Sequence, residues 1–272
     1  MQKVVFIDWN FFVHRSLFSC SRQGNLDLAP FQCIRGILAC LKLIKLTEDD
    51  LIIFAVDSPL GSWRKSVDPN YKSNRDAIKK LANIDWDFWY IKFNALLTHL
   101  IDCTPFHKVE CERLEADDII SVGTRFYKDR EVIIVSRDSD FFQLELYQNI
   151  KILNPITKKF QIVNNPHKVL SQKIRSERTD NLKVAPKTAE EYQKRNLIVN
   201  LLSLPEYIEN MVVKSFHMMN IHKCYNCYGF KFDRLVPDLK NLFRQEGKKI
   251  LTYNDSFKKK RKTKNIPVAS IY

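Results

Sequence analysis

The sequence predicts an α/β fold, in which a mostly parallel central sheet is flanked by helices and followed by a smaller C-terminal helical lobe. Three short, uninterrupted apolar runs have the composition of strands buried on both faces of a parallel sheet: residues 4–7, 51–56 and 132–135. Apolar residues at helical spacing occupy three further segments: residues 31–46, 86–101 and 116–127. Strands that alternate with helices in this way are typical of βαβ units.

A hairpin and a helical segment complete the expected architecture. Strand-like runs at 150–153 and 160–163 flank Asn154 and Pro155, which predicts a hairpin. Apolar periodicity over 196–216 predicts the helical lobe. We therefore expect three parts, listed here with their boundaries: an α/β domain over residues 1–180, the lobe over 181–250 and a basic tail over 251–272.

Composition excludes several classes of protein. The 272 residues are 45% hydrophobic and 12% aromatic with only 6 Gly and 10 Pro, which excludes a disordered or collagen-like chain. No apolar run is long enough to span a membrane, and the first residues lack a signal-peptide core, so we expect a cytoplasmic protein without a membrane partner. Seven cysteines, an odd number, argue against a secreted disulfide framework and predict buried thiols.

The charge points to a polyanionic partner. Lys and Arg number 44 against 31 Asp and Glu, a net charge of +13, which makes nucleic acid the first candidate. The run at 258–264 carries six of these basic residues. It fits a solvated end, a docking segment, added DNA affinity or nuclear import, so a nuclear location stays open beside the cytoplasm.

Carboxylates follow the predicted strands and open a predicted helix. Because the carboxyl ends of parallel strands share one edge of a sheet, these acids are expected to converge. The nine candidate metal ligands are Asp8, Asp57, Glu115, Asp117, Asp118, Asp138, Asp140, Glu177 and Asp180. In a helical first turn Glu115 and Asp118 share one face, with Asp117 offset from it. The alternative for each cluster alone is a set of helix-start or loop acids.

Converging carboxylates would repel each other strongly unless hard cations neutralised them. Mg²⁺ and Mn²⁺ take oxygen ligands of this kind. The many basic residues around such an acidic, metal-loaded centre would hold a phosphate backbone over it. This combination predicts metal-dependent hydrolysis of phosphodiester bonds. A second group of residues mixes basic and aromatic side chains suited to phosphates and unpaired bases, namely Arg64, Lys65, Tyr71, Lys72 and Arg75. The alternative for Lys72 and Arg75 is ordinary surface charge on a helix.

At these residues the chain resembles the 5' nuclease superfamily of flap endonucleases and 5'-3' exonucleases, and within it the ribonuclease H-type 5' nucleases of T-even phages. The matching stretches occur in family order over the first ~180 residues. They are 6–10 (FIDWN), 54–57 (FAVD), 69–76 (PNYKSNRD), 114–120 (LEADDII) and 134–141 (IVSRDSDF). The resemblance implies a PIN-like catalytic core with a helical arch or clamp at about 60–90.

The resemblance also implies roles for the acids and two bound ions, Mg²⁺ or alternatively Mn²⁺. Five acids correspond to ligands of the first metal, with Asp118 close by: Asp8, Asp57, Glu115, Asp117 and Asp138. Asp140 corresponds to a ligand of the second metal, and Glu177 with Asp180 occupies the place of a Gly-Asp-x-x-Asp element. Because Glu177 replaces an Asp there, the resemblance does not carry over the family's geometry at the second metal. Lys72 and Arg75 would be the catalytic cations that stabilise the scissile phosphate.

One departure from the family concerns duplex binding. The family carries a Gly-rich helical hairpin that grips duplex DNA before an Arg-Asn-Leu segment, and here residues 192–198 resemble that later segment only a short way after Asp180. Most of the gripping element is therefore missing, which predicts weaker binding of downstream duplex or an altered substrate preference.

These features together predict a monomeric, metal-dependent 5'-3' exonuclease or flap endonuclease of a phage or bacterium. It would act near 5' ends of DNA, or of RNA primers in RNA:DNA hybrids, in replication or repair, beside a single-strand-binding protein, clamp or polymerase. The alternatives are a catalytically decayed, structure-specific nucleic-acid-binding protein and a PIN-like ribonuclease. A zinc site at His217, His222, Cys224 and Cys227 is disfavoured, because a structural site usually has two separated ligand pairs.

Overall fold

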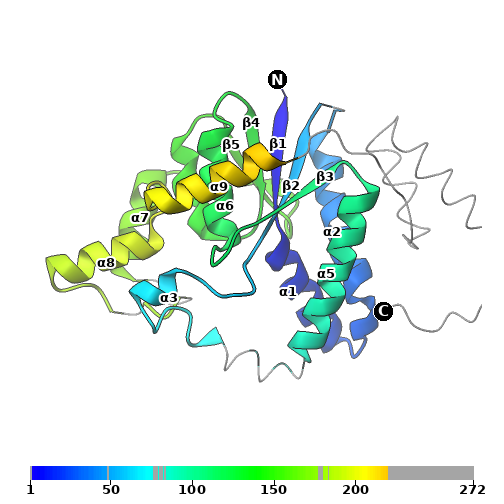
Figure 1. Ribbon diagram of the computed structural model, residues 1–272, viewed down its shortest axis with the longest axis horizontal. Helices are drawn as coiled ribbons and strands as arrows, with labels where there is room; N and C mark the ends of the chain where they lie inside the picture. Colours follow the sequence, from blue (N-terminus) through cyan, green and yellow to red (C-terminus); the bar gives the residue numbers. More distant parts are fainter. Residues whose placement is uncertain are drawn as a thin grey trace, which may run out of the picture.

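A six-stranded sheet forms the centre of the protein, and the first five strands of the chain run parallel (Figure 1). The computed structural model describes residues 2–219 apart from 48, 76–78, 80–81, 83, 177–179 and 183. The strands are β1 (Lys3–Asp8), β2 (Leu51–Val56), β3 (Phe106–Glu110), β4 (Glu131–Val135), β5 (Ile150–Asn154) and β6 (Lys159–Phe160). Their order is β3-β2-β1-β4-β5-β6, with β6 antiparallel to β5. The predicted fold class and hairpin are thus confirmed.

Two strands differ from the expectation. Strand β3 was not predicted, because its sequence alternates buried Phe106 and Val109 with exposed Lys108 and Glu110 in place of a continuous apolar run. Such alternation is expected of an edge strand with one solvated side. Strand β6 is shorter than the predicted run 160–163, although the amide of Gln161 still donates to the carbonyl of Ile152 at 2.7 Å.

Helices cover both faces of the sheet. Side chains alternate along β1, so Val5 and Ile7 enter the core on one face while Val4 and Phe6 enter the core on the other. The first face carries α1 (Trp9–Arg22), α2 (Ala29–Ile44) and α5 (Trp86–Cys103), with the short turn η1 (Leu26–Leu28) between α1 and α2. The second face carries α6 (Ala116–Phe126), η2 (Ser139–Leu146) and α9 (Glu206–Met218). The three predicted helical segments correspond to α2, α5 and α6.

The C-terminal helices pack against the α/β core. Ile208, Val212 and Phe216 of α9 are buried in the same core as β1 and α6. A smaller cluster joins Tyr71 to helices α7 (Pro166–Arg175) and α8 (Ala189–Val199), beside the short helix α3 (Arg64–Val67). The described part of the expected lobe is therefore continuous with the sheet domain. The rest of the lobe and the basic tail lie outside the described residues.

Four cysteines have the buried, unpaired thiols that were expected: Cys20, Cys33, Cys40 and Cys111. The side chain of Cys103 and residues 224 and 227 lie outside the described set. Among the helices that the structure describes, none combines the length and apolar character of a membrane span.

Gly123 allows α6 to approach the sheet closely. A Cβ atom at this position would lie 2.2 Å from the Phe6 ring, whose side chain is fully buried. Gly36 on α2 offers a contrast, because a Cβ atom there would meet the Phe12 ring at 3.5 Å, an ordinary contact distance.

We predict that Gly123→Ala lowers the free energy of unfolding by about 1–2 kcal/mol, because overpacking at Phe6 outweighs the gain in helix propensity. Gly36→Ala should be neutral or stabilising by up to ~1 kcal/mol, since its Cβ has room. Urea denaturation of both variants tests the pair, and equal effects would show that close packing at Phe6 is not the cause.

Candidate active site

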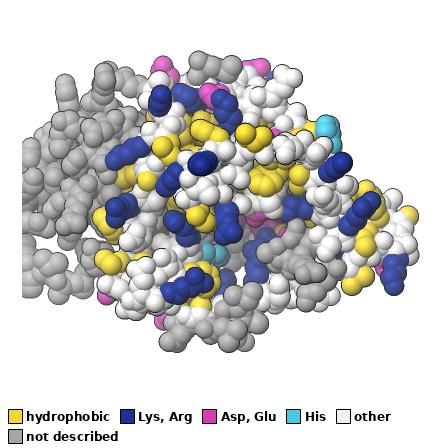
Figure 2. Space-filling view, turned by 180° about the vertical axis from the view of Figure 1, so that it is seen from behind, with side chains coloured by type: hydrophobic (Ala, Val, Ile, Leu, Met, Phe, Trp, Pro, Cys, Tyr) yellow, Lys and Arg dark blue, Asp and Glu magenta, His cyan; other side chains and the backbone are white. Residues whose placement is uncertain are grey.

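The site lies where the strand order reverses. Chain direction runs from β1 through β2 to β3, and β4 then returns to the other side of β1, so the carboxyl ends of β1 and β4 border a crevice. Such reversal points are where open α/β sheets bind ligands. A cavity of about 490 Å³ opens there. Figure 2 shows Lys and Arg over much of one face of the molecule, with acidic side chains recessed near its middle.

Seven of the nine predicted acids line this cavity. They are Asp8, Asp57, Glu115, Asp117, Asp138, Asp140 and Asp180. Glu177 lies outside the described residues, so its expected role at a second metal stays a prediction. Asp118 does not line the cavity and is fully buried elsewhere.

Local hydrogen bonds fix the acids at the strand ends. Asp8 caps α1 by accepting from the amide of Phe11 at 3.1 Å, and its other oxygen accepts from the Ser136 hydroxyl at 2.7 Å. Asp57 accepts from the amide of Ala116 at 2.8 Å and from Asn10 Nδ2 at 2.8 Å. These bonds join β1, β2 and α6, so the acids are held close together by the fold itself.

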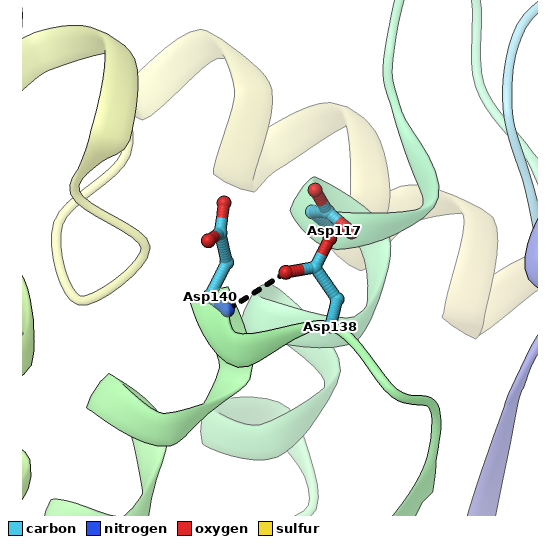
Figure 3. Close-up of side chains that lie close together, drawn as sticks. All are labelled: Asp117, Asp138 and Asp140. Atoms are coloured by element: carbon cyan, nitrogen blue, oxygen red, sulfur yellow. Dashed lines mark hydrogen bonds between the residues drawn. The ribbon is translucent and has the colours of Figure 1, made fainter. Parts of the chain in front are cut away.

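Three carboxylates form the tightest group. One oxygen from each of Asp117, Asp138 and Asp140 lies within 4.8 Å of the others. Figure 3 shows Asp117, at the start of α6, and Asp138, in the turn after β4, pointing toward each other. Asp138 also accepts from the amide of Asp140 at 2.9 Å, which orients its side chain at the start of η2. We call Asp117, Asp138 and Asp140 the three-carboxylate group.

Burial and mutual repulsion make the charged forms of these acids costly. Burial, together with Asp57, raises the pKa of Asp8 to about 6. Burial and the neighbouring Asp140 raise the pKa of Asp138 to about 7, and burial with Asp138 raises the pKa of Asp117 well above its usual value. Burial and Glu115 also raise the pKa of Asp57.

The donor set fits a hard divalent cation. All of the converging ligand atoms are carboxylate oxygens, the type that Mg²⁺, Mn²⁺ and Ca²⁺ prefer. Within the part of the chain that the structure describes, no hydrogen-bond donor or cation is paired with the side chain of Asp117. A cation bound at the three-carboxylate group would therefore add direct positive contacts to Asp117, on which the charge of Lys72 acts without an ion pair among the described residues.

Three basic side chains of the cavity each pair with a different acid. Lys72 Nζ donates to Glu115 Oε1 at 2.5 Å, and Arg75 donates to Asp180 Oδ1 at 3.0 Å. Lys173 of α7 forms an ion pair with Asp140. The predicted cations Lys72 and Arg75 therefore do reach the carboxylate cavity.

Lys72 lies in a strained turn that hydrogen bonds with Asp180 and Asn181 hold in place. Its φ is +57°, in the left-handed region that non-glycine residues seldom adopt. Its amide donates to the carbonyl of Asp180 at 3.1 Å, and the side chain of Asn181 donates to Ser73 Oγ at 3.0 Å. The segment around Lys72 and the segment around Asp180, about a hundred residues apart in the chain, are thus joined directly at the cavity wall.

Glu115 differs from the other acids because donors surround it. Tyr71 donates its hydroxyl to Oε2 at 3.0 Å, and Arg64 NH1 donates to the same oxygen at 2.9 Å. Although burial alone would raise it, Lys72 and Arg64 lower the pKa of Glu115 to about 2. Glu115 is consequently a fixed negative charge that positions Lys72.

The predicted roles of Arg64, Tyr71 and Asp118 need correction. Arg64 is only 2% exposed. Its two terminal nitrogens donate to the carboxylate of Asp118 at 2.7 and 3.0 Å, and its Nε donates to the carbonyl of Ile198 at 2.7 Å. Trp63 Nε1 donates to Asp118 at 3.0 Å. A guanidinium enclosed in this way cannot contact a phosphate backbone, and the buried ring of Tyr71 cannot stack on a base. Lys65 is exposed, so its predicted contact with nucleic acid stays a prediction.

Several cavity residues were not predicted from the sequence. Asn10 and His14 line the cavity from α1, Arg137 from the turn after β4, and Lys173 from α7. Arg137 directly precedes Asp138 and Asn10 lies two residues after Asp8, so proximity in sequence could have indicated both. His14 has no such signal. Its ring contacts the hydroxyl of Tyr90 at 2.6 Å, and burial, with Lys79 and Arg75 nearby, lowers its pKa to about 4.

The disfavoured zinc site stays untested. Its first residue, His217, packs against the Phe126 ring, and its other residues lie outside the described set.

We predict that Arg64→Gln lowers the free energy of unfolding by about 3–5 kcal/mol, because it leaves the carboxylate of Asp118 buried without its charge partner. Arg125→Gln is the control, since Arg125 forms a more exposed pair with Glu209 on the same helix as Asp118 and should cost only ~1 kcal/mol. Urea denaturation measures both variants. A loss at Arg64 no larger than that at Arg125 would contradict the structural role assigned to Arg64.

Comparisons with known proteins agree with this fold. A model of the 5'-3' exonuclease N-terminal, resolvase-like domain matches residues 3–175. The ribonuclease H of Enterobacteria phage T4 is 25% identical over 247 residues, which cover 78% of this chain and 81% of the phage protein. A 5'-3' exonuclease of Mycoplasmopsis pulmonis is 30% identical over 224 residues, 77% of this chain and 70% of the relative.

The fold also matches a solved structure. The T5 5'-exonuclease, determined with bound zinc ions, superposes with a TM-score of 0.53 at 15% identity, over 92% of this chain and 97% of the T5 chain. The resemblance seen in the sequence motifs is therefore confirmed over most of the chain. By the family model and these relatives, the chain belongs to the 5'-3' exonuclease family.

Proposed function

We propose that the cavity hydrolyses phosphodiester bonds at or near the 5' ends of DNA, or of RNA primers in RNA:DNA hybrids, with two bound Mg²⁺ ions. The observation that carries this proposal is the placement of Lys72 and Arg75 beside the three-carboxylate group in one cavity of a 5'-3' exonuclease fold. Carboxylate oxygens are the ligands that hard divalent cations prefer, and Lys and Arg side chains form strong hydrogen bonds with phosphate oxygens. Mn²⁺ is the alternative ion.

The residues of the chain divide the chemistry between them. Bound divalent cations would activate the attacking water and stabilise the leaving oxygen. Lys72 and Arg75 supply positive charge toward the phosphate oxygens, and Glu115 and Asp180 hold these two side chains at the cavity. His14 lines the cavity as a neutral side chain that is hydrogen-bonded to Tyr90, so it adds no positive charge beside the phosphate.

The substrate proposal follows the relatives and the positive surface. One relative is named ribonuclease H and another 5'-3' exonuclease, which supports RNA primers or DNA flaps with free 5' ends as substrates. The net charge of +13 favours a polyanion. A role in clearing primers or flaps during replication or repair, beside a polymerase, clamp or single-strand-binding protein, fits this substrate class. The shortened segment after Asp180 supports weaker binding of downstream duplex.

We predict that Mg²⁺ or Mn²⁺ raises the melting temperature of the wild-type protein by roughly 5 °C at saturation, because the ion binds the folded carboxylate cavity and not the unfolded chain. Asp138→Asn should lose this rise. In EDTA the same variant should be at least as stable as the wild type, because one like charge is removed from the three-carboxylate group. Thermal unfolding followed by circular dichroism tests both statements. A variant that is less stable in EDTA would show that Asp138 has a structural and not a metal-binding role.

Substrate cleavage tests the proposed activity directly. With Mg²⁺, 5'-labelled nicked, flapped and RNA-primed duplexes should be cut to products with 5'-phosphate and 3'-hydroxyl ends, and EDTA or Asp138→Asn should abolish cutting. The lengths of the products distinguish exonuclease from flap endonuclease action. Tight binding without cleavage in either Mg²⁺ or Mn²⁺ would favour a decayed binding protein. Cutting of single-stranded RNA without dependence on a 5' end would favour a PIN-like ribonuclease.

We predict that Lys72→Met and Arg75→Met each lower kcat by at least about 100-fold, because each removes a charge aimed at the reacting phosphate. Lys214→Met on the exposed face of α9, outside the cavity, should leave kcat unchanged. Single-turnover cleavage of the substrate that is cut fastest measures the three variants. A similar rate for all three would refute the catalytic assignment.

A further inference from the structure

Lys173 is a buried cation in contact with the three-carboxylate group. It belongs to α7, is 7% exposed and lines the cavity. Its ammonium forms an ion pair with the carboxylate of Asp140 and lies 3.4 Å from Ser139 Oγ. Among the described residues, it is the one basic side chain that forms an ion pair with a member of this group, since Lys72 and Arg75 pair with Glu115 and Asp180.

The helix that carries Lys173 is fixed in place. Helix α7 packs on η2, which carries Asp140, and the neighbouring Ile174 is buried in the small cluster with Tyr71, Leu182 and Ile198. The ammonium can therefore swing on its side chain, but the backbone holds it within reach of Asp140. A lysine head group needs several oxygen partners when it is removed from water, and Asp140 and Ser139 provide them.

A divalent cation at the three-carboxylate group would need the same oxygen atoms. It must either displace the ammonium from Asp140 or bind beside a positive charge that already neutralises this ligand. Either route lowers the net attraction between the group and the ion. Among the described residues, neither Asp117 nor Asp138 forms an ion pair with Lys173, although the charge of Lys173 also favours the ionised form of Asp138.

We propose that Lys173 is a tethered competitor for the cation at the three-carboxylate group, and that it thereby sets the affinity of this site for its ion. The proposal rests on the proposed function, because it requires that the group binds a divalent cation. Lys173 acts through Asp140 and is in this sense a positioning residue. Its ammonium neutralises Asp140 in the metal-free protein, and we expect it to leave Asp140 when the ion binds.

Calorimetric titration of the full chain with Mn²⁺ tests the proposal. Lys173→Met should bind Mn²⁺ about ten-fold more tightly than the wild type, because the competing charge is gone. Lys173→Arg keeps the charge and should stay within about two-fold of the wild type. Lys168→Met is the matched control, an exposed lysine on the same helix, and should leave the affinity unchanged. Lys173→Gln carries the same expectation as Lys173→Met if the methionine variant fails to fold.

A double-mutant comparison separates competition at Asp140 from a general effect of charge. In an Asp140→Asn background, Lys173→Met should no longer strengthen Mn²⁺ binding, because the shared ligand has been removed. Equal or weaker binding by Lys173→Met alone would overturn the proposal, and so would an unchanged gain in the Asp140→Asn background. If neither the wild type nor Lys173→Met binds Mn²⁺, the metal centre itself is refuted and the proposed function fails with it. Wild-type binding that Lys173→Met does not alter refutes the role of Lys173 alone.

Discussion

Repulsion among buried carboxylates is the constraint that shapes this protein around its cavity. Parallel strands deliver Asp8, Asp57 and Asp138 to one edge of the sheet, and α6 adds Glu115 and Asp117. In the low-dielectric interior such a gathering is unfavourable unless positive charge meets it. Burial, and after it the repulsion from Asp57 and Asp140, raises the pKa of Asp8 to about 6 and the pKa of Asp138 to about 7.

Basic side chains from separate segments of the chain offset this repulsion by forming ion pairs with the acids. The same ion pairs also hold those segments together. Lys72 and Arg75 fix the segment before α5 to Glu115 and Asp180, and Lys173 fixes α7 to Asp140. Arg64 works deeper in the structure, where it joins Asp118 of α6 to the end of α8. The same charge pairs thus stabilise the fold and position the groups proposed to act on phosphate. Asp117 has no ion-pair partner among the described residues, and we propose that a metal ion takes this place.

How far the sequence predicts this site depends on the range of the contacts. Asp8 and Asp57 were predictable because each follows a buried apolar run. The spacing of Glu115 and Asp118 correctly placed both on one side of α6, where Arg64 contacts both of them. Of these two only Glu115 also lines the cavity, which it shares with the offset Asp117. Neither Arg64 nor Lys173 carries a local signal, because their partners lie far away in the chain. Ion pairs between residues far apart in the chain decide which charged side chains stabilise the fold, and the composition of the sequence does not reveal these pairs.

The central claim is that the three-carboxylate group is a divalent metal centre. Anomalous diffraction from crystals of the full chain grown with saturating Mn²⁺ tests it most directly. We expect a manganese peak within coordination distance of Asp117 and Asp138, with the ammonium of Lys173 displaced from Asp140. A map with no peak there, and Lys173 still bound to Asp140, would contradict the account.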